Sequence, residues 1–322
     1  MSEKSVDLVL EGGGVKGIAL LGAVLVLADA GCRFQRIAGT SAGAIVAALV
    51  AAYQKEGKNL AELADVMRDV DYRRFADEPW PQRVTGVAGD ALAAFVHGGS
   101  HGGDYLVEWL TPLLEGVGVR TFADLRCPDE GGSLQDHQKY SLVVHASDLS
   151  RRALVRLPWD YALYDLNADD QSVVDAVRAS MAIPFYFRPV HVATRRGTCT
   201  WVDGGLLANF PITVFDRTDG AAPRWPTWGV KLSGRPVAGQ DRPVRTVPGI
   251  AVNCLRTLTG DWNQYRLDSE GVGRRTMFVD TMNVSATDFG ISRAEQEKLF
   301  ENGRQAAREF LDVQSSARRL AG

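Results

Sequence analysis

The sequence predicts an α/β fold, in which strands and helices alternate along the chain. Residues 6–31 read as a short apolar strand, a glycine-rich loop and an apolar helix. The same order follows at once in "RIAG", "GTSAG" and "AIVAALVAAYQ". Further apolar strands lie between residues 140 and 281, before a long amphipathic helix. No repeat, low-complexity tract or linker divides the 322 residues, so we expect one domain over 1–322.

The elements of the first half follow from local patterns. "VDLVLE" is the first strand, and its helix runs to about Asp29. The two apolar helices are too short to span a membrane and rich in small residues, so we expect them to be buried. A polar helix follows at 59–70. Residues 71–103, which contain Trp80 and "HGGSHGG", predict a loop or cap insertion because glycine and proline interrupt regular structure. Asp104 is typical of a helix N-cap.

The second half predicts an antiparallel strand pair, "YSLVVHASDL" and "RRALVRLP", around a turn at Ser150. A helix at 171–182 follows and ends before Pro184. Three more strands are expected in "CTWVDGG", "TWGVKLS" and "RTMFVDT". The terminal amphipathic helix is expected over 292–311.

Composition excludes several classes of protein. The net charge is −3 and the arginines lie in scattered pairs, so no nucleic-acid partner is expected. The four cysteines are far apart, which predicts neither a zinc site nor a disulfide framework. The N-terminus has no signal-peptide pattern, so we expect a cytoplasmic protein whose membrane contact is at most peripheral.

The glycine loop is the first motif that carries chemistry. Gly12, Gly14 and Gly17 match G-x-G-x-x-G, the dinucleotide pattern, yet the second strand ends in "GTSAG" without the acidic residue that binds ribose. Ile18 and Ala19 stand where a P-loop has Lys and Ser or Thr. What remains is a set of backbone N–H groups at a helix N-terminus, directed at negative charge.

The second motif is "GTSAG", a G-x-S-x-G centred on Ser41 at a strand-to-helix junction. Such a junction exposes a nucleophilic serine, although a helix N-cap serine occupies the same position. A serine nucleophile needs a base. The five histidines, of which the last is His191, are each expected to be structural or on the surface. His97 and His101 have the spacing of a helical metal pair but lie in a glycine-rich loop.

The third motif is "WVDGGLLANFP", in which Asp203 ends a predicted strand and two glycines follow. In an α/β sheet, ligands bind at strand ends, so Asp203 is a candidate base. An ordinary Asp-Gly turn has the same sequence.

Together these motifs resemble the patatin-like phospholipases. "GGGVKG", "GTSAG" and "DGG" occur in the family's order, and "RASMAIPFYF" together with Asn209 and Pro211 extends the match to about residue 211. The resemblance implies a three-layer α/β/α sandwich with a mainly parallel central sheet. It also implies a Ser-Asp dyad without histidine, with Ser41 as nucleophile and Asp203 as base.

The same resemblance assigns the N–H groups of Gly12, Gly13 and Gly14 to an oxyanion hole. Lys16 stands where other members carry arginine, which assigns it to substrate binding. Glu11 stands where plant members carry aspartate.

The implied function is a serine esterase of the phospholipase A or lysophospholipase type, acting on phospholipid or another lipid ester through an acyl-enzyme. No cofactor or metal is implied. One alternative is an acyltransferase that uses the same serine, and another is an NAD(P)-binding protein that uses the glycine loop. A third is a hydrolase that is inactive until a partner or small molecule binds. The 75–103 region and Phe185-Tyr186-Phe187 are candidates for a cap and an acyl pocket that dock at a membrane surface. The same residues would also be expected if these aromatic side chains belonged to the core beneath a loop. Oligomeric state is left open.

Overall fold

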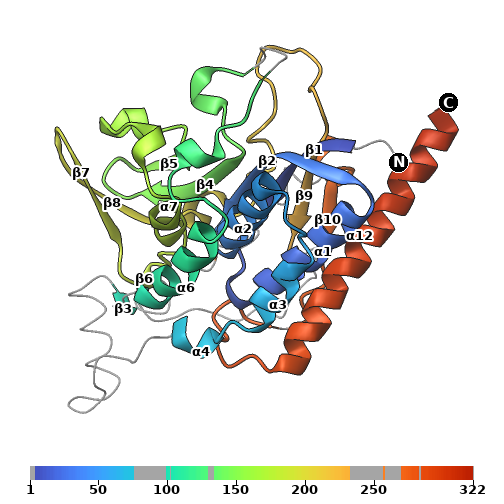
Figure 1. Ribbon diagram of the computed structural model, residues 1–322, viewed down its shortest axis with the longest axis horizontal. Coiled ribbons are helices and arrows are strands. Elements are labelled where there is room, and N and C mark those ends of the chain that lie inside the picture. The colour runs from blue at the N-terminus through green and yellow to red at the C-terminus, as the bar shows by residue number, and fades with distance from the viewer. Residues whose placement is uncertain are drawn as a thin grey trace.

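A mixed, mostly parallel β-sheet forms the centre of the molecule (Figure 1). The computed structural model describes residues 4–75, 99–101, 103–129, 134–232, 257, 270–282 and 284–321. Within these, the strands of the main sheet are β1 (Lys4–Leu10), β2 (Cys32–Thr40), β4 (Leu142–Asp148), β5 (Ala153–Leu157), β7 (Val190–Thr194), β8 (Gly197–Asp203), β9 (Thr227–Lys231) and β10 (Thr276–Phe278). Two short strands, β3 (Gly99–His101) and β6 (Phe185–Phe187), pair separately.

The sheet has a parallel half and an antiparallel half. Its order is β10-β9-β1-β2-β4-β8-β7, with β5 also paired to β4. The strands from β10 to β4 run parallel, whereas β5 and β8 pair with β4, and β7 pairs with β8, in the antiparallel sense. The parallel strands therefore end at one common edge, where ligands bind in folds of this class.

Helices cover one face of the sheet. They are α1 (Gly17–Asp29), α2 (Ala42–Glu56), α3 (Glu62–Arg68), α4 (Tyr72–Phe75), α6 (Asp104–Glu115), α7 (Val173–Ser180) and α12 (Arg293–Ala321). α12, α1, α2, α7 and α6 contact one another in that order (Figure 1). As predicted, α1 and α2 are almost wholly buried. α1 and α12 cross closely at Gly22 and Gly303, because a Cβ at either position would meet the other helix's backbone at 2.2 Å or 1.9 Å.

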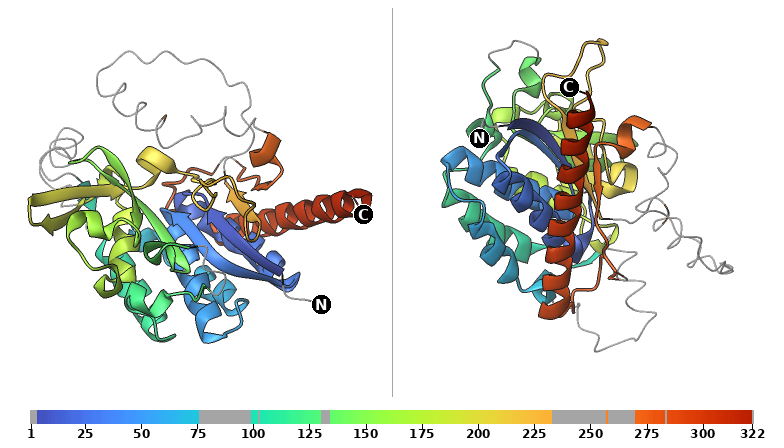
Figure 2. Two further views of the ribbon diagram at one scale, coloured as in Figure 1. Left: turned by 90° about the horizontal axis from the view of Figure 1, so that it is seen from above. Right: turned by 90° about the vertical axis from the view of Figure 1, so that its right-hand side faces the viewer.

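The opposite face is covered by α8 (Gly205–Ala208) and the segment after it. A further short helix, α11 (Glu270–Gly273), lies just before β10 in the chain. α8 contacts β4 and β5. A Cβ at Gly229 would meet the rings and methyls of Phe210 and Ile212, whereas the neighbouring Trp228 packs on Phe310 of α12. Layers therefore lie on both faces of the sheet (Figure 2), and the predicted α/β sandwich is confirmed. Among the described helices, none is both long and apolar enough to cross a bilayer.

Two strands, β2 and β8, pair with the same edge of β4, and this arrangement positions the site. β2 pairs with residues 142–145 of β4, β8 pairs with residues 146–148, and β5 pairs with residues 144–148. Since β5 overlaps both of the others, β2 and β8 must lie along the same edge of β4. They approach from opposite directions, so the ends of β2 at Thr40 and of β8 at Asp203 meet head to head.

The hairpin of β7 and β8 and the short strand β6 were not expected as such. The turn between Thr194 and Gly197 is "TRRG", which lacks the usual Asn-Gly or Asp-Gly signal, and Gly197 has a φ of 128°. Asp104 begins α6, but the N-cap position is held by Gly103. In the predicted cap, α4 and β3 are ordered elements, whereas residues 76–98 and 102 lie outside the described residues.

Candidate active site

Ser41 sits in a sharp turn between β2 and α2. Its φ of 53° and ψ of −125° are unusual for a residue with a side chain, and such backbone strain clusters at functional sites. A Cβ at Gly39 would lie 2.3 Å from the Gly43 carbonyl oxygen, and one at Gly43 would lie 2.5 Å from that of Leu10. Only glycine therefore fits at either flank, which confirms the predicted geometry of the elbow.

Ser180 holds this turn in place. Its side-chain oxygen accepts a hydrogen bond from the Ser41 N–H at 2.8 Å and donates to the His145 carbonyl at 2.6 Å. Ser180 is fully buried, so no water replaces either bond. The residue lies in the "RASMAIP" block of the sequence, but no pattern within that block indicated this contact.

Asp203 ends β8 directly opposite the elbow. Its Oδ1 accepts the Gly205 N–H at 2.7 Å, and its own N–H donates to Ala182. Oδ2 is buried and has no hydrogen-bond partner among the described residues. Burial raises the pKa of Asp203 to about 7, although the nearby Ser41 hydroxyl and the Gly205 N–H both act to lower it. The carboxyl is thus poised to exchange a proton near neutral pH.

The glycine loop lies beside the elbow. A Cβ at Gly12 would be 3.1 Å from the Ser41 Cβ, which places the start of the loop against the serine. The Gly12 N–H donates to the Asn209 carbonyl at 3.1 Å, so it is not free for an oxyanion as the resemblance implied. Within the described chain, the N–H groups of Gly13 and Gly14 have no acceptor. Gly14 has a φ of 55° and touches the Ala286 backbone, so it must remain glycine.

Buried polar contacts fix the base of this loop. Glu11 forms an ion pair with Lys231 at 2.8 Å, with both side chains 2% exposed, and accepts the Leu232 N–H. Asn209 donates to the Gly12 carbonyl at 3.2 Å, and its Oδ1 faces both Gly12 and Gly205. Asn209 thereby ties the glycine loop to the Asp-Gly-Gly segment. The motif contained Asn209, but nothing in the sequence pointed to Lys231.

Lys16 lies against the glycine loop. Its Cε would be 3.5 Å from a Cβ at Gly13, and its N–H donates to the Gly13 carbonyl at 3.2 Å. The side chain is half-buried. The structure thus gathers Ser41, Asp203, the three glycines and Lys16 in one place.

An apolar pocket opens beside the elbow. It reaches from the glycine loop and the start of α2, across α4, to the 289 region. Its lining residues are Gly14, Val15, Gly17, Ala42, Ile45, Met67, Val70, Tyr72, Phe75, Trp109, Met181 and Phe289. Sδ of Met181 lies 3.5 Å from the Ser41 Oγ, so the pocket begins beside Ser41.

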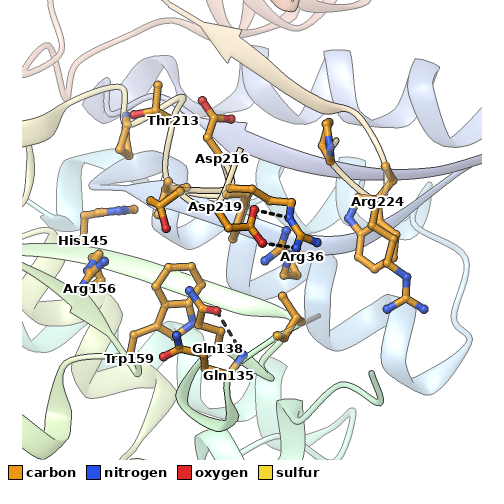
Figure 3. Close-up of a pocket in the computed structure, with 18 of the residues that line it drawn as sticks. Arg36, Gln135, Gln138, His145, Arg156, Trp159, Thr213, Asp216, Asp219 and Arg224 are labelled. Carbon is orange, nitrogen blue, oxygen red and sulfur yellow. Dashed lines mark hydrogen bonds and ion pairs between the residues drawn. The ribbon is translucent and has the colours of Figure 1, made fainter. Parts of the chain in front are cut away.

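A larger cavity of about 460 Å³ lies on the opposite face, and Figure 3 shows the side chains around it. Its arginines are paired with acids, as in Arg36 with Asp7 and Arg156 with Asp160. Its histidine, His145, is fully buried, and burial lowers its pKa to about 4. Neither cavity is lined by Ser41 or Asp203, but the apolar pocket includes Met181, which contacts the Ser41 hydroxyl, whereas the larger cavity has no such contact among the described residues.

Ser180→Ala tests the support of the elbow. We expect kcat on a soluble ester to fall about 10- to 100-fold with KM nearly unchanged, because the Ser41 N–H and the His145 carbonyl lose their buried partner. Steady-state kinetics measure this split. Ser180→Cys, which keeps a weak donor and acceptor, should recover part of kcat. An unchanged kcat in Ser180→Ala would contradict the positioning role.

The chain is similar in sequence to known proteins over most of its length. A model of the patatin-like phospholipase family matches residues 8–216. The uncharacterized protein YqhO of Bacillus subtilis is 34% identical over 309 residues, covering 95% of this chain and 98% of YqhO. The uncharacterized NTE family protein Rv2565 of Mycobacterium tuberculosis is 29% identical over 66% of this chain, which spans only 28% of that relative.

Two solved structures share the fold. VipD from Legionella pneumophila superposes with a TM-score of 0.51 at 18% identity, over 97% of this chain and 67% of VipD. ExoU in its complex with SpcU from Pseudomonas aeruginosa gives the same TM-score and identity, over 97% of this chain and 52% of the other.

Proposed function

The chain belongs to the patatin-like phospholipase family, whose members are lipid ester hydrolases, and we propose that it cleaves carboxylic esters of phospholipids or lysophospholipids through a Ser41–Asp203 dyad. One observation carries this proposal. The elbow serine and a buried carboxyl with a raised pKa meet at the head-to-head ends of β2 and β8, next to the N–H groups of Gly13 and Gly14, which have no acceptor among the described residues.

The first half-reaction forms an acyl-enzyme. The Ser41 Oγ attacks the ester carbonyl carbon while its proton passes to Asp203. The tetrahedral intermediate then collapses, the bond to the alcohol breaks, and Asp203 returns the proton to the leaving alcohol. In the second half-reaction, water gives its proton to Asp203 and attacks the acyl carbon, and Ser41 recovers its hydrogen as the fatty acid leaves.

The N–H groups of Gly13 and Gly14 are suited to the negative charge of the tetrahedral intermediate. Each such donor contributes about 10²- to 10³-fold to the rate in enzymes of this kind. The N-terminus of α1 begins at Gly17, and its dipole adds positive potential at the same place. The assignment of Gly12 to this hole is replaced by a structural role, because its N–H is bonded to Asn209.

The apolar lining of the pocket supports a fatty acyl chain as the group transferred; the pocket itself holds about 20 Å³, so its side chains must move apart to admit the chain. Its side chains are aliphatic, aromatic or thioether, and it starts at Met181 beside the nucleophile. Burial of each methylene of an acyl chain in such a pocket is worth about 0.8 kcal/mol. The Lys16 ammonium, at the loop next to Ser41, is placed to attract a phosphate in the headgroup.

Lipid product analysis tests the substrate class. The protein is incubated with vesicles of mixed phospholipids and lysophospholipids, and the products are identified by mass spectrometry, with Ser41→Ala as the blank. We expect free fatty acid and the matching deacylated lipid. Acyl groups moved onto another alcohol without free fatty acid would identify the acyltransferase alternative and contradict hydrolysis.

The pH dependence follows from the raised pKa of Asp203. The base must be unprotonated, so kcat/KM on a neutral soluble ester should be constant above about pH 7 and fall as pH decreases below it. Well below that pH the fall approaches tenfold per pH unit. A pH profile of kcat/KM measures this, and a rate that stays constant down to pH 5 would contradict Asp203 as the base with this pKa.

A further inference from the structure

The β7–β8 hairpin carries an uncompensated positive charge. It is paired from Val190–Trp201 to Thr194–Gly197 and projects from the body of the molecule (Figure 1). Residues 183–202 include Arg188, His191, Arg195 and Arg196 but no aspartate or glutamate. All four of these basic side chains are exposed.

Most of the described arginines outside the hairpin and the neighbouring turn are paired with acids. Arg68 pairs with Glu297, and Arg126 pairs with Asp169. In the described part of the chain, by contrast, Arg188, Arg195 and Arg196 make no ion pair. The same holds for Arg152, which lies in the turn between β4 and β5.

This turn lies beside the hairpin. The Leu149 N–H donates to the Thr200 carbonyl, and the Thr200 N–H donates to the Ser150 Oγ. Arg152 therefore belongs to a turn that contacts the hairpin at Thr200. The exposed residues of the hairpin and of the segments next to it are called the basic edge: Arg152, Arg188, Arg195, Arg196, Leu149 and Phe185.

The strand register places the hairpin beyond the end of β2 at which Ser41 lies. β2 ends at Thr40, next to Ser41, and β8 continues along the same edge of β4 in the direction in which β2 was pointing. Between Asp203 and Gly197 β8 extends about 20 Å further, at about 3.3 Å per residue. The hairpin thus overhangs the end of the sheet where Ser41 lies.

Two exposed apolar side chains accompany the charges. Leu149 is 47% exposed and Phe185 is 53% exposed. The next residue, Tyr186, stacks on Phe289 with ring centroids 5.2 Å apart, and Phe289 lines the apolar pocket beside Ser41. Phe185 is therefore near the rim of that pocket.

We propose that the basic edge docks on an anionic phospholipid bilayer and so presents the Ser41 pocket to its lipid substrate. The delivery of lipid to Ser41 rests on the proposed function, whereas binding to the bilayer does not require hydrolysis. Unpaired arginines attract anionic headgroups, and exposed Leu149 and Phe185 are suited to the interface between headgroups and acyl chains. A nucleic acid would use the charges but would leave these apolar side chains and the neighbouring acyl pocket without a partner.

Vesicle binding by the full-length Ser41→Ala protein tests the proposal independently of hydrolysis. Sedimentation is measured with phosphatidylcholine vesicles and with phosphatidylcholine vesicles that also contain phosphatidylserine, at low and high salt. We expect binding only with phosphatidylserine, weakened by salt. Each arginine near an anionic leaflet strengthens binding about fivefold, so adding Arg195→Gln and Arg196→Gln should weaken it about 30-fold.

A matched control removes two charges from the other end of the molecule. Lys58, just beyond the C-terminus of α2, and Arg274, just before β10, lie at the opposite edge of the sheet from Ser41. Lys58→Gln with Arg274→Gln should leave vesicle binding within about twofold of the parent protein.

With Ser41 restored, the Arg195→Gln and Arg196→Gln variant should hydrolyse a soluble ester at the parental rate, which shows that it is folded. Equal binding to both kinds of vesicle, or equal binding by the arginine variant and its parent, would overturn the proposal. Binding to duplex DNA through the same arginines, without binding to vesicles, would also overturn it. Loss of hydrolysis in the parent protein would leave the binding result unaffected, so the two proposals fail separately.

Discussion

Ser41→Ala is expected to reduce hydrolysis of a soluble p-nitrophenyl ester by at least about 10³-fold, because it removes the only atom that forms the acyl-enzyme. The Cβ and the backbone turn are retained, and the Ser180 hydroxyl still accepts the N–H of residue 41. The melting temperature should therefore change little. Initial rates and thermal unfolding measure the two effects on one preparation.

A second serine provides the control. Ser141 precedes β4 and donates to the Leu125 carbonyl, away from the elbow. Ser141→Ala should keep its activity within a few-fold of the parent protein. Substantial hydrolysis by Ser41→Ala, above about a hundredth of the parental rate, would contradict the nucleophile assignment.

Asp203→Asn is expected to reduce kcat/KM by about 10³- to 10⁴-fold, because an amide cannot accept the serine proton. The amide oxygen can still accept the Gly205 N–H that Oδ1 accepts now. The glycine loop, Ser180 and the apolar pocket remain in place. Activity close to that of the parent protein would exclude Asp203 as the base.

The same substitution should stabilise the fold at alkaline pH. Burial raises the folded-state pKa of Asp203 to about 7, above its unfolded value, so the folded protein holds the proton more tightly. Its stability therefore falls as pH rises from about 4 through 7, where the carboxylate is buried unpaired. Asp203→Asn lacks this loss, so its melting temperature should exceed that of the parent at pH 8, and the difference should shrink at pH 5.

Asp148→Asn is the contrasting variant. Asp148 is equally buried, but its oxygens accept hydrogen bonds from Ser150, Arg151 and Tyr164. Loss of those charged acceptors should destabilise the fold at pH 8. Destabilisation by both substitutions would contradict the view that Asp203 is held ionised at a cost to stability.

Much of the fold could be predicted from local sequence. The alternation of apolar strands and helices predicts β1, α1 and α2 with nearly correct ends, because each carries its own hydrophobic pattern and glycine boundary. For β2 only the C-terminal part, "RIAG", was predicted, and the strand begins four residues earlier at Cys32. The elbow was also predictable, since Gly39 and Gly43 mark a place where side chains do not fit. Asp203 was located as a strand end followed by two glycines.

The remaining features depend on contacts between distant segments. Nothing near Ser180 indicates that its hydroxyl bridges Ser41 to His145, 35 residues away from it in the chain. Lys231 reaches Glu11 across 220 residues. The hydrogen bond from the Gly12 N–H was missed for the same reason, because its acceptor, the Asn209 carbonyl, lies 197 residues further along the chain. The β7–β8 hairpin was missed because its turn lacks the residues that normally signal one.

Labelling with a fluorophosphonate, mapped by peptide mass spectrometry, tests the dyad most directly. Ser41 of the parent protein should be labelled, at a rate that rises with pH towards a plateau near pH 7. Ser41→Ala should not be labelled, and Asp203→Asn should be labelled at least about 10²-fold more slowly. Labelling of another residue, or equal rates in the parent and Asp203→Asn proteins, would contradict the dyad.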